Sequence, residues 1–156
     1  MTKQKHSEKA LEKFREGYNC AQSILYAFME NHIDEAVALN ISVGFGAGMG
    51  KKQKVCGVIS GAVMALGLMY GNEGNSNQEK TSNVYKKVQY LIKRFTQEKG
   101  GINCIKLLKG CNLLTNEGQE YFQKNKLKET LCCQYVTLTC EILEEIIIGK
   151  LNRTIL

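Results

Sequence analysis

Residues 55–70 read VCGVISGAVMALGLMY. This apolar run is shorter than the roughly 18 to 20 residues that a membrane-spanning helix needs, and its glycines and serine lower its hydrophobicity further. We therefore expect a buried central helix. Gly57 and Gly61 are four residues apart and so share one helix face, which Ala65 continues. Small residues on such a face let another helix approach closely.

The glycines of this predicted helix need a compensating interaction. A glycine inside a helix costs about 1 kcal/mol relative to alanine. Tight packing against another helix would offset that cost, and so would room for a ligand beside Cys56. On the second interpretation Gly57 and Gly61 form part of a cofactor-binding wall. The sequence leaves both interpretations open.

Helices are predicted through almost all of the chain. It contains no proline, so nothing forces an extended break. Apolar spacing, capping residues and glycines predict helices at about 5–16, 19–30, 34–43, 55–70, 78–96, 104–108, 115–124 and 128–148. A length of 156 residues is typical of one domain. We predict an all-α single domain over 1–156, a bundle of about six to eight helices around a buried, small-residue-rich central helix.

The glycine-rich segment 44–50, GFGAGMG, does not have the spacing of a phosphate-binding loop. The dinucleotide fingerprint starting at Gly44 would place its last glycine on Met49, and the P-loop pattern ending at Gly50-Lys51 would place its first glycine on Phe45. Alternate glycines do permit close backbone approach. We interpret the segment as a packing element or site wall that leads to Cys56.

Charge and the N-terminal residues bear on compartment and partners. The net charge is +6, but the lysines are spread out, and the densest run, KKQK at 51–54, has no interleaved aromatics. This pattern predicts a solvated basic face rather than nucleic-acid binding. No apolar run follows the lysines near the N-terminus, so we expect no signal peptide and a cytoplasmic protein. Thiols stay reduced in that compartment.

The chain has seven cysteines, at positions 20, 56, 104, 111, 132, 133 and 140. A chain of this length can bury most of its apolar surface without disulfides. In a reducing compartment the cysteines are therefore better explained by catalysis, redox chemistry or metal binding than by structural disulfide bonds. No Cys-x-x-Cys occurs, which argues against a thioredoxin-type dithiol, a zinc ribbon and a zinc knuckle.

Four cysteines share one local context. Cys20 and Cys104 each follow an asparagine at a predicted helix start, Cys56 opens the central helix, and Cys132 lies in the first two turns of the last helix. The partial positive charge of a helix N-terminus favours thiolate over thiol. Lys54 would act on Cys56 in the same direction. We expect these four to form the working site.

The remaining three cysteines are weaker candidates for the working site. Cys140 lies in the middle of the last helix and is expected in the core, and Cys133, seven residues earlier, is on the same face. Adjacent helical residues point about 100° apart, so Cys132 and Cys133 are not expected to serve one small site equally. Cys111, in a loop seven residues after Cys104, is a candidate resolving thiol.

Several segments resemble the C_GCAxxG_C_C family of redox-active proteins, which is marked by four cysteines and a Cys-Gly-Ala-x-x-Gly motif. The resemblance covers nearly the whole chain and rests on residues 17–22 (GYNCAQ), 45–50 (FGAGMG), 55–62 (VCGVISGA), 104–108 (CIKLL), 132–136 (CCQYV) and 141–145 (EILEE). It implies that the family cysteines are Cys20, Cys56, Cys104 and Cys132. Val58 replaces the usual alanine, and Cys133 is an alternative fourth cysteine.

The residues and the resemblance together leave two chemistries open. In one, the cysteines transfer electrons by thiol–disulfide exchange, with Cys56 as the predicted attacking thiol. In the other, the same four thiolates bind a metal ion or an iron–sulfur cluster. A non-catalytic interaction protein with buried cysteines is a third hypothesis. The sequence identifies no redox partner protein, and the apolar Ile146–Ile148 could supply the face of a homodimer.

Overall fold

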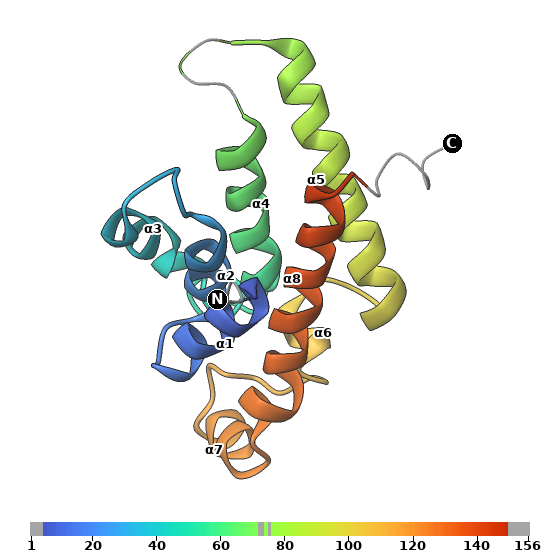
Figure 1. Cartoon of the computed structure of the whole chain (residues 1–156). Coiled ribbons are helices and arrows are strands. Elements are labelled where there is room, and N and C mark those ends of the chain that lie inside the picture. The colour runs from blue at the N-terminus through green and yellow to red at the C-terminus, as the bar shows by residue number, and fades with distance from the viewer. Residues whose placement is uncertain (1–4, 72–73, 75, 150–156) are drawn as a thin grey trace.

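The computed structural model describes residues 5–71, 74 and 76–149, and over these residues it is an all-α bundle (Figure 1). The α-helices are α1 (His6–Arg15), α2 (Cys20–Phe28), α3 (Glu35–Ser42), α4 (Gly57–Tyr70), α5 (Gln78–Lys99), α6 (Cys104–Leu107), α7 (Asn116–Lys124) and α8 (Cys133–Ile147). A 3₁₀ turn, η1 (Val43–Phe45), follows α3, and a π-helical turn, η2 (Lys128–Cys132), precedes α8. The fold class is as predicted.

The central helix is α4. It contacts α2, α5 and α8, which surround it in Figure 1. Ala62, Ala65 and Leu66 of α4 are fully buried, and they belong to a core that includes Ile24 of α2 and Leu143 of α8. The sequence-based prediction of a buried, small-residue-rich central helix is therefore confirmed.

The two glycines of α4 face α2 at very short range. A Cβ atom at Gly61 would lie 2.6 Å from the carbonyl oxygen of Ala21 and 3.1 Å from Cβ of Ile24. A Cβ atom at Gly57 would contact Sγ of Cys20. Only glycine allows this approach, so helix packing, the first of the two interpretations, explains both positions.

A side-chain capping hydrogen bond forms at the start of α2 but not at the starts of α3 and α6. At α2 the Asn19 side chain accepts a hydrogen bond from the Gln22 amide, and the Gln22 side chain accepts one from the Asn19 amide, each at 3.0 Å. This reciprocal capping box fixes the start of the helix. Asp34 and Asn103 occupy the corresponding positions at α3 and α6, but neither side chain makes a capping hydrogen bond. Both residues stand at the N-cap position, but no side-chain hydrogen bond stabilises these two helix starts.

The last predicted helix, 128–148, is not uniform. Its first turn is η2, a π-helical turn over Lys128–Cys132, and α8 follows without a break. Single π-helical turns are frequent at functional sites. Of the apolar residues at its end, Ile146 is buried in the core, whereas Ile147 and Ile148 are exposed.

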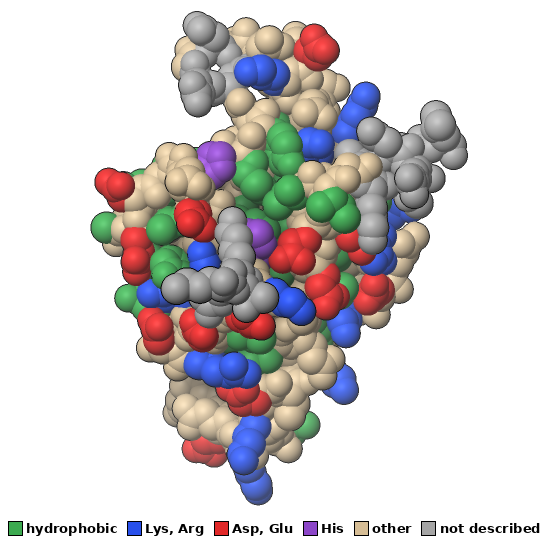
Figure 2. All heavy atoms as spheres, in the orientation of Figure 1, with side chains coloured by type: hydrophobic (Ala, Val, Ile, Leu, Met, Phe, Trp, Pro, Cys, Tyr) green, Lys and Arg blue, Asp and Glu red, His purple; other side chains and the backbone are tan. Residues whose placement is uncertain are grey.

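Charged side chains of both signs are interspersed over the face of the molecule shown in Figure 2. Several lysines pair with carboxylates, as Lys9 does with Glu30 at 3.0 Å and Lys13 with Glu35 at 3.1 Å. None of the helices in the described part of the chain is both long enough and apolar enough to cross a membrane.

The α2–α4 contact can be tested with two glycines of the same helix. We expect Gly61→Ala to lower the free energy of unfolding by about 1–3 kcal/mol, because the new methyl group meets the backbone of α2. Gly67 has no atom within 4 Å of the added Cβ. Gly67→Ala should therefore raise that free energy by up to about 1 kcal/mol. Urea unfolding followed by circular dichroism measures both; equal effects would argue against the close packing.

Candidate functional site: a cavity lined by four cysteines

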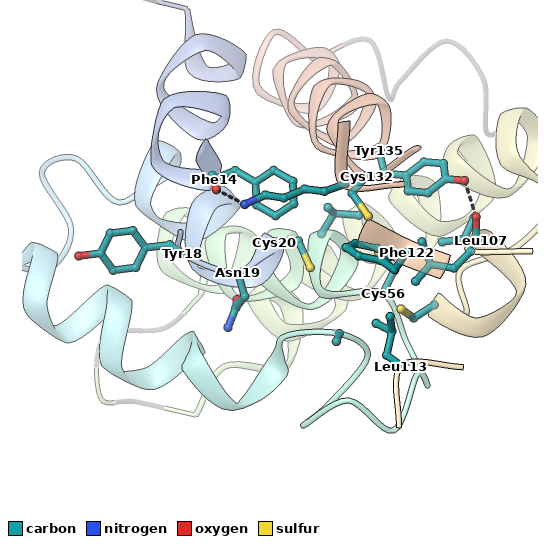
Figure 3. A pocket seen from close by; sticks show the side chains of 15 residues that line it. Phe14, Tyr18, Asn19, Cys20, Cys56, Leu107, Leu113, Phe122, Cys132 and Tyr135 are labelled. Atoms are coloured by element: carbon teal, nitrogen blue, oxygen red, sulfur yellow. Dashed lines mark hydrogen bonds between the residues drawn. The ribbon is translucent and has the colours of Figure 1, made fainter. Parts of the chain in front are cut away.

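All four cysteines singled out from the sequence line one cavity of about 240 Å³. Cys20, Cys56, Cys104 and Cys132 are separated by up to 112 positions in the chain, so only the tertiary structure brings them together. In Figure 3 the side chains of Cys20 and Cys132 enter the same space from α2 and from the start of the last helix. Most of the remaining wall consists of apolar and aromatic side chains.

Cys20 is placed by the start of α2. It is the first residue of that helix, directly after the capping residue Asn19. Asn19 also donates a hydrogen bond from its side-chain amide to the carbonyl oxygen of Val43 at 2.8 Å. This bond ties the start of α2 to η1, the turn that leads into the glycine-rich segment 44–50. The residue that caps the helix therefore also positions the loop beside Cys20.

Cys56 and Cys104 are brought together by a short antiparallel backbone contact. Val55 and Asn103 form an isolated β-bridge. On either side of it the Cys56 amide donates to the carbonyl oxygen of Ile102, and the Cys104 amide donates to that of Lys54, both at 2.7 Å. The contact sets the start of α4 beside the start of α6.

Gln53 reinforces this arrangement from a buried position. Its side-chain amide donates to the carbonyl oxygen of Cys111 at 2.7 Å, and its side-chain oxygen accepts from the Leu113 amide at 2.8 Å. The Gln53 side chain also hydrogen-bonds the Cys104 thiol, which acts to lower the pKa of that thiol. A single buried polar side chain thus holds the 111–113 loop against Cys104.

Cys132 reaches the cavity from the π-turn η2. One turn further on, the Tyr135 hydroxyl donates to the carbonyl oxygen of Leu107 at 2.7 Å, a bond drawn in Figure 3. This bond is buried and fastens α8 to α6. Because Tyr135 and Cys132 are three residues apart, the same contact holds Cys132 against the cavity.

The glycine-rich loop contributes a backbone donor. Residues 47–51 all have positive φ, including the non-glycine Ala47 (50°), Met49 (72°) and Lys51 (64°). Such left-handed conformations at non-glycine residues are strained and cluster at functional sites. Here the turn directs the Ala47 amide at the Cys20 sulfur. The predicted site wall is therefore also a source of hydrogen bonding to Cys20.

Cys20 is the thiol that this environment ionises. The hydrogen bond from the Cys56 thiol is the largest cause that lowers the pKa of Cys20, to about 7. Burial opposes it, and the backbone amides of Ala47 and Ala21 lower the pKa further. The same hydrogen bond, together with burial, raises the pKa of Cys56 well above its usual value. The two thiols therefore behave as one thiolate and one thiol that share a proton.

The other two thiols are held neutral. Burial and the negative charge of Cys20 raise the pKa of Cys104 to about 11. Burial is also the main cause that raises the pKa of Cys132. The expectation that a helix start lowers the pKa of all four thiols therefore holds only for Cys20. At the others, desolvation and neighbouring sulfurs outweigh the helix.

The three remaining cysteines lie outside the cavity lining. Cys133 is turned to Glu129, to which its thiol donates at 3.6 Å, so Cys132 is the one of the adjacent pair that reaches the cavity. Cys140 is fully buried in the core, as predicted. Cys111 donates from its thiol to the carbonyl oxygen of Gly118 at 3.1 Å.

Sequence reasoning missed several residues of the site. Gly57 and Gly61, considered above as a cofactor-binding wall, do not line the cavity and face α2 instead. Lys128, Tyr135 and Phe122 do line it. Lys128, Cys132 and Tyr135 follow one another at spacings of four and three, a helical-face pattern that could have identified Lys128 and Tyr135.

As a metal site the four thiols do not fit in their present positions. Within residues 5–71, 74 and 76–149, no group of three or more cysteine, histidine, aspartate or glutamate side chains is arranged to hold a metal ion. A four-cysteine ligand set would require these side chains to move closer together.

The comparisons with known proteins place the chain in a family. A family model described as "Putative redox-active protein (C_GCAxxG_C_C)" matches residues 18–146. The match covers most of the chain and all four cavity cysteines, and the chain belongs to this family. Neither the curated proteins nor the solved structures contain a match.

The ionisation of Cys20 can be followed by its rate of alkylation with iodoacetamide. We expect the rate to rise with pH through about 7 and then level off, since only the thiolate reacts. Cys56→Ala removes the hydrogen bond to the thiolate and should shift this midpoint upward by about one unit or more. Cys56→Ser keeps a donor and should shift it less. Identical midpoints in the two variants would contradict the role of the hydrogen bond.

Proposed function

We propose that this member of the C_GCAxxG_C_C family carries out thiol–disulfide exchange, with Cys20 as the attacking thiol and Cys56 as the resolving thiol. The observation that supports the proposal is the hydrogen-bonded Cys20–Cys56 pair on a cavity wall, in which one sulfur is ionised near neutral pH. An attacking thiol is most effective when its pKa is close to the ambient pH.

The exchange proceeds in two displacement steps. The Cys20 thiolate attacks one sulfur of a disulfide substrate, the substrate S–S bond breaks, and a mixed disulfide with Cys20 forms while the other sulfur leaves as a thiolate. Cys56 then loses its proton to that leaving thiolate and attacks Cys20 Sγ. A Cys20–Cys56 disulfide forms, the substrate leaves as a dithiol, and two electrons have passed from protein to substrate. The reverse sequence oxidises a dithiol.

This proposal reverses the assignment made from the sequence, in which Cys56 attacks. Cys56 donates its proton to Cys20 and has a raised pKa, so little of it is thiolate at neutral pH. Cys56 regains nucleophilicity once Cys20 is in a mixed disulfide, because Cys20 then carries no charge. The order of the two steps follows from the electrostatics of the pair.

Cys104 and Cys132 would serve as a second pair. The Val55–Asn103 bridge places Cys104 beside Cys56. A charge on Cys104 raises the pKa of Cys132, as expected for neighbouring thiols. After the first disulfide forms, deprotonated Cys104 can attack Cys56, and Cys132 can then attack Cys104. The Cys20–Cys56 dithiol is regenerated, and a Cys104–Cys132 disulfide remains. The raised pKa of Cys104 makes this transfer the slower one.

The proposed exchange predicts a specific disulfide. Mild oxidation under anaerobic conditions with a stoichiometric disulfide should remove two free thiols, and peptide mapping should find Cys20 linked to Cys56. Cys20→Ser should abolish the reaction, whereas Cys56→Ser should trap the mixed disulfide on Cys20. Cys133→Ala, outside the cavity lining, is the matched control and should behave as the unaltered protein. An unchanged thiol count would refute the proposal.

The metal alternative is tested by the same preparation before oxidation. Four cysteine thiolates are the usual ligands of an iron–sulfur cluster. The exchange proposal predicts an anaerobically purified protein that is colourless and contains metal well below one equivalent. A coloured protein with stoichiometric iron, lost in Cys104→Ser, would instead favour the cluster.

A further inference from the structure

The size of the cavity limits what can fit inside it beside Cys20. A cavity of about 150 Å³ in a protein core holds a benzene molecule. At about 240 Å³ the present cavity has room for a molecule of roughly ten non-hydrogen atoms. A tripeptide disulfide is several times larger than this. A protein disulfide could enter only if its loop were as narrow as a small molecule.

The wall of the cavity is mostly apolar and contains one cationic side chain. Leu107, Leu108 and Leu113 line it together with the aromatic rings of Phe14 and Phe122. The residues that line it, all of them in the described part of the chain, include no aspartate or glutamate, and their single cationic side chain is Lys128. Such a wall favours a hydrocarbon body that carries a negative charge at one point.

Lys128 is held in place at this cavity. Its ammonium group donates to the carbonyl oxygen of Phe14 at 2.7 Å and lies 4.4 Å from the centre of the Phe14 ring. In Figure 3 this hydrogen bond is the dashed line at Phe14. An ammonium group has three donors, so a bond to Phe14 leaves it able to bind an anion as well. Lys128 is four residues before Cys132, so the charge and the cavity thiols share one wall.

We propose that the cavity binds a compact dithiol or disulfide whose body is a hydrocarbon chain and whose single carboxylate pairs with Lys128. This inference rests on the exchange proposed above and names its substrate class. The carboxylate lies at Lys128, the hydrocarbon chain lies against the leucines and phenylalanines, and the sulfur atoms meet the Cys20–Cys56 pair. In the dithiol direction, one substrate thiolate attacks Cys20 Sγ and displaces the Cys56 thiolate. The second substrate thiol then gives its proton to the Cys56 thiolate and attacks the substrate sulfur bonded to Cys20, which closes the substrate disulfide and releases the Cys20 thiolate.

Two dithiols that differ only in charge test this inference. Dihydrolipoate has a carboxylate at the end of its hydrocarbon chain, and dihydrolipoamide has a neutral amide at the same place. The full-length protein is first oxidised to the Cys20–Cys56 disulfide, and its reduction by each probe is followed by quenching with an alkylating agent and mass spectrometry. We expect dihydrolipoate to react about tenfold faster at equal low concentration, as for a hydrogen bond between charged groups. Glutathione should be slower than either.

Variants of two lysines assign the preference to the cavity. Lys128→Gln removes the charge but keeps a donor for the Phe14 carbonyl, and it should bring the ratio of the two rates close to one. Lys124→Gln removes the same charge from the exposed end of α7 and should leave the ratio unchanged. Because the ratio compares two probes on one protein, a change in thiol pKa caused by Lys128→Gln cancels.

The outcomes separate this inference from the exchange itself. If the Cys20–Cys56 disulfide forms but both probes reduce it equally fast, the substrate class is wrong and the exchange stands. If the preference for dihydrolipoate survives in Lys128→Gln, the anion site is not at Lys128 and the inference is overturned. If oxidation forms neither a Cys20–Cys56 nor a Cys104–Cys132 disulfide, the exchange itself fails.

Discussion

The close approach of α2 and α4 is the constraint on which the site depends. Gly57 and Gly61 of α4 have no side chains, so this helix packs directly against the start of α2, where Cys20 lies. Cys56 is the residue immediately before α4, so the same contact brings the sulfurs of Cys20 and Cys56 into hydrogen-bonding range. Packing and chemistry therefore use one interface. A bulkier residue at Gly57 would meet the Cys20 sulfur itself.

Burial and hydrogen bonding together set the different pKa values of the four cavity thiols. Removing a thiol from water raises its pKa, and this effect dominates at Cys104 and Cys132. Cys20 is also withdrawn from water, but it accepts hydrogen bonds from the Cys56 thiol and from backbone amides, and these outweigh desolvation. One thiolate in the cavity then makes a second thiolate costly. The site holds one thiolate among neutral thiols because of this competition.

The loops that carry the site were harder to predict than the helices. Helical spacing and capping residues located α1 to α7 within a few residues. The left-handed turn at 47–51 and the Val55–Asn103 bridge had no sequence signal beyond the glycines, because both depend on backbone contacts with distant segments. Gln53 was missed for the same reason, since its partners at 111 and 113 are remote in the chain. The spacing of apolar residues also did not distinguish the π-turn η2 from the α-helix that follows it.

The sequence by itself determined the helical class and the buried central helix, and it singled out Cys20, Cys56 and Cys104 as candidate site residues, because these depend on local spacing and on residue type. It could not decide which sulfur is ionised, since that depends on donors contributed by Cys56 and by the 47–51 turn. Nor could it decide between Cys132 and Cys133. These residues are adjacent in the chain, but only the Cys132 side chain reaches the cavity, whereas that of Cys133 points to Glu129. Only the tertiary structure could enclose the four thiols in one cavity with Lys128 on its wall, because those residues come from segments that share no local signal.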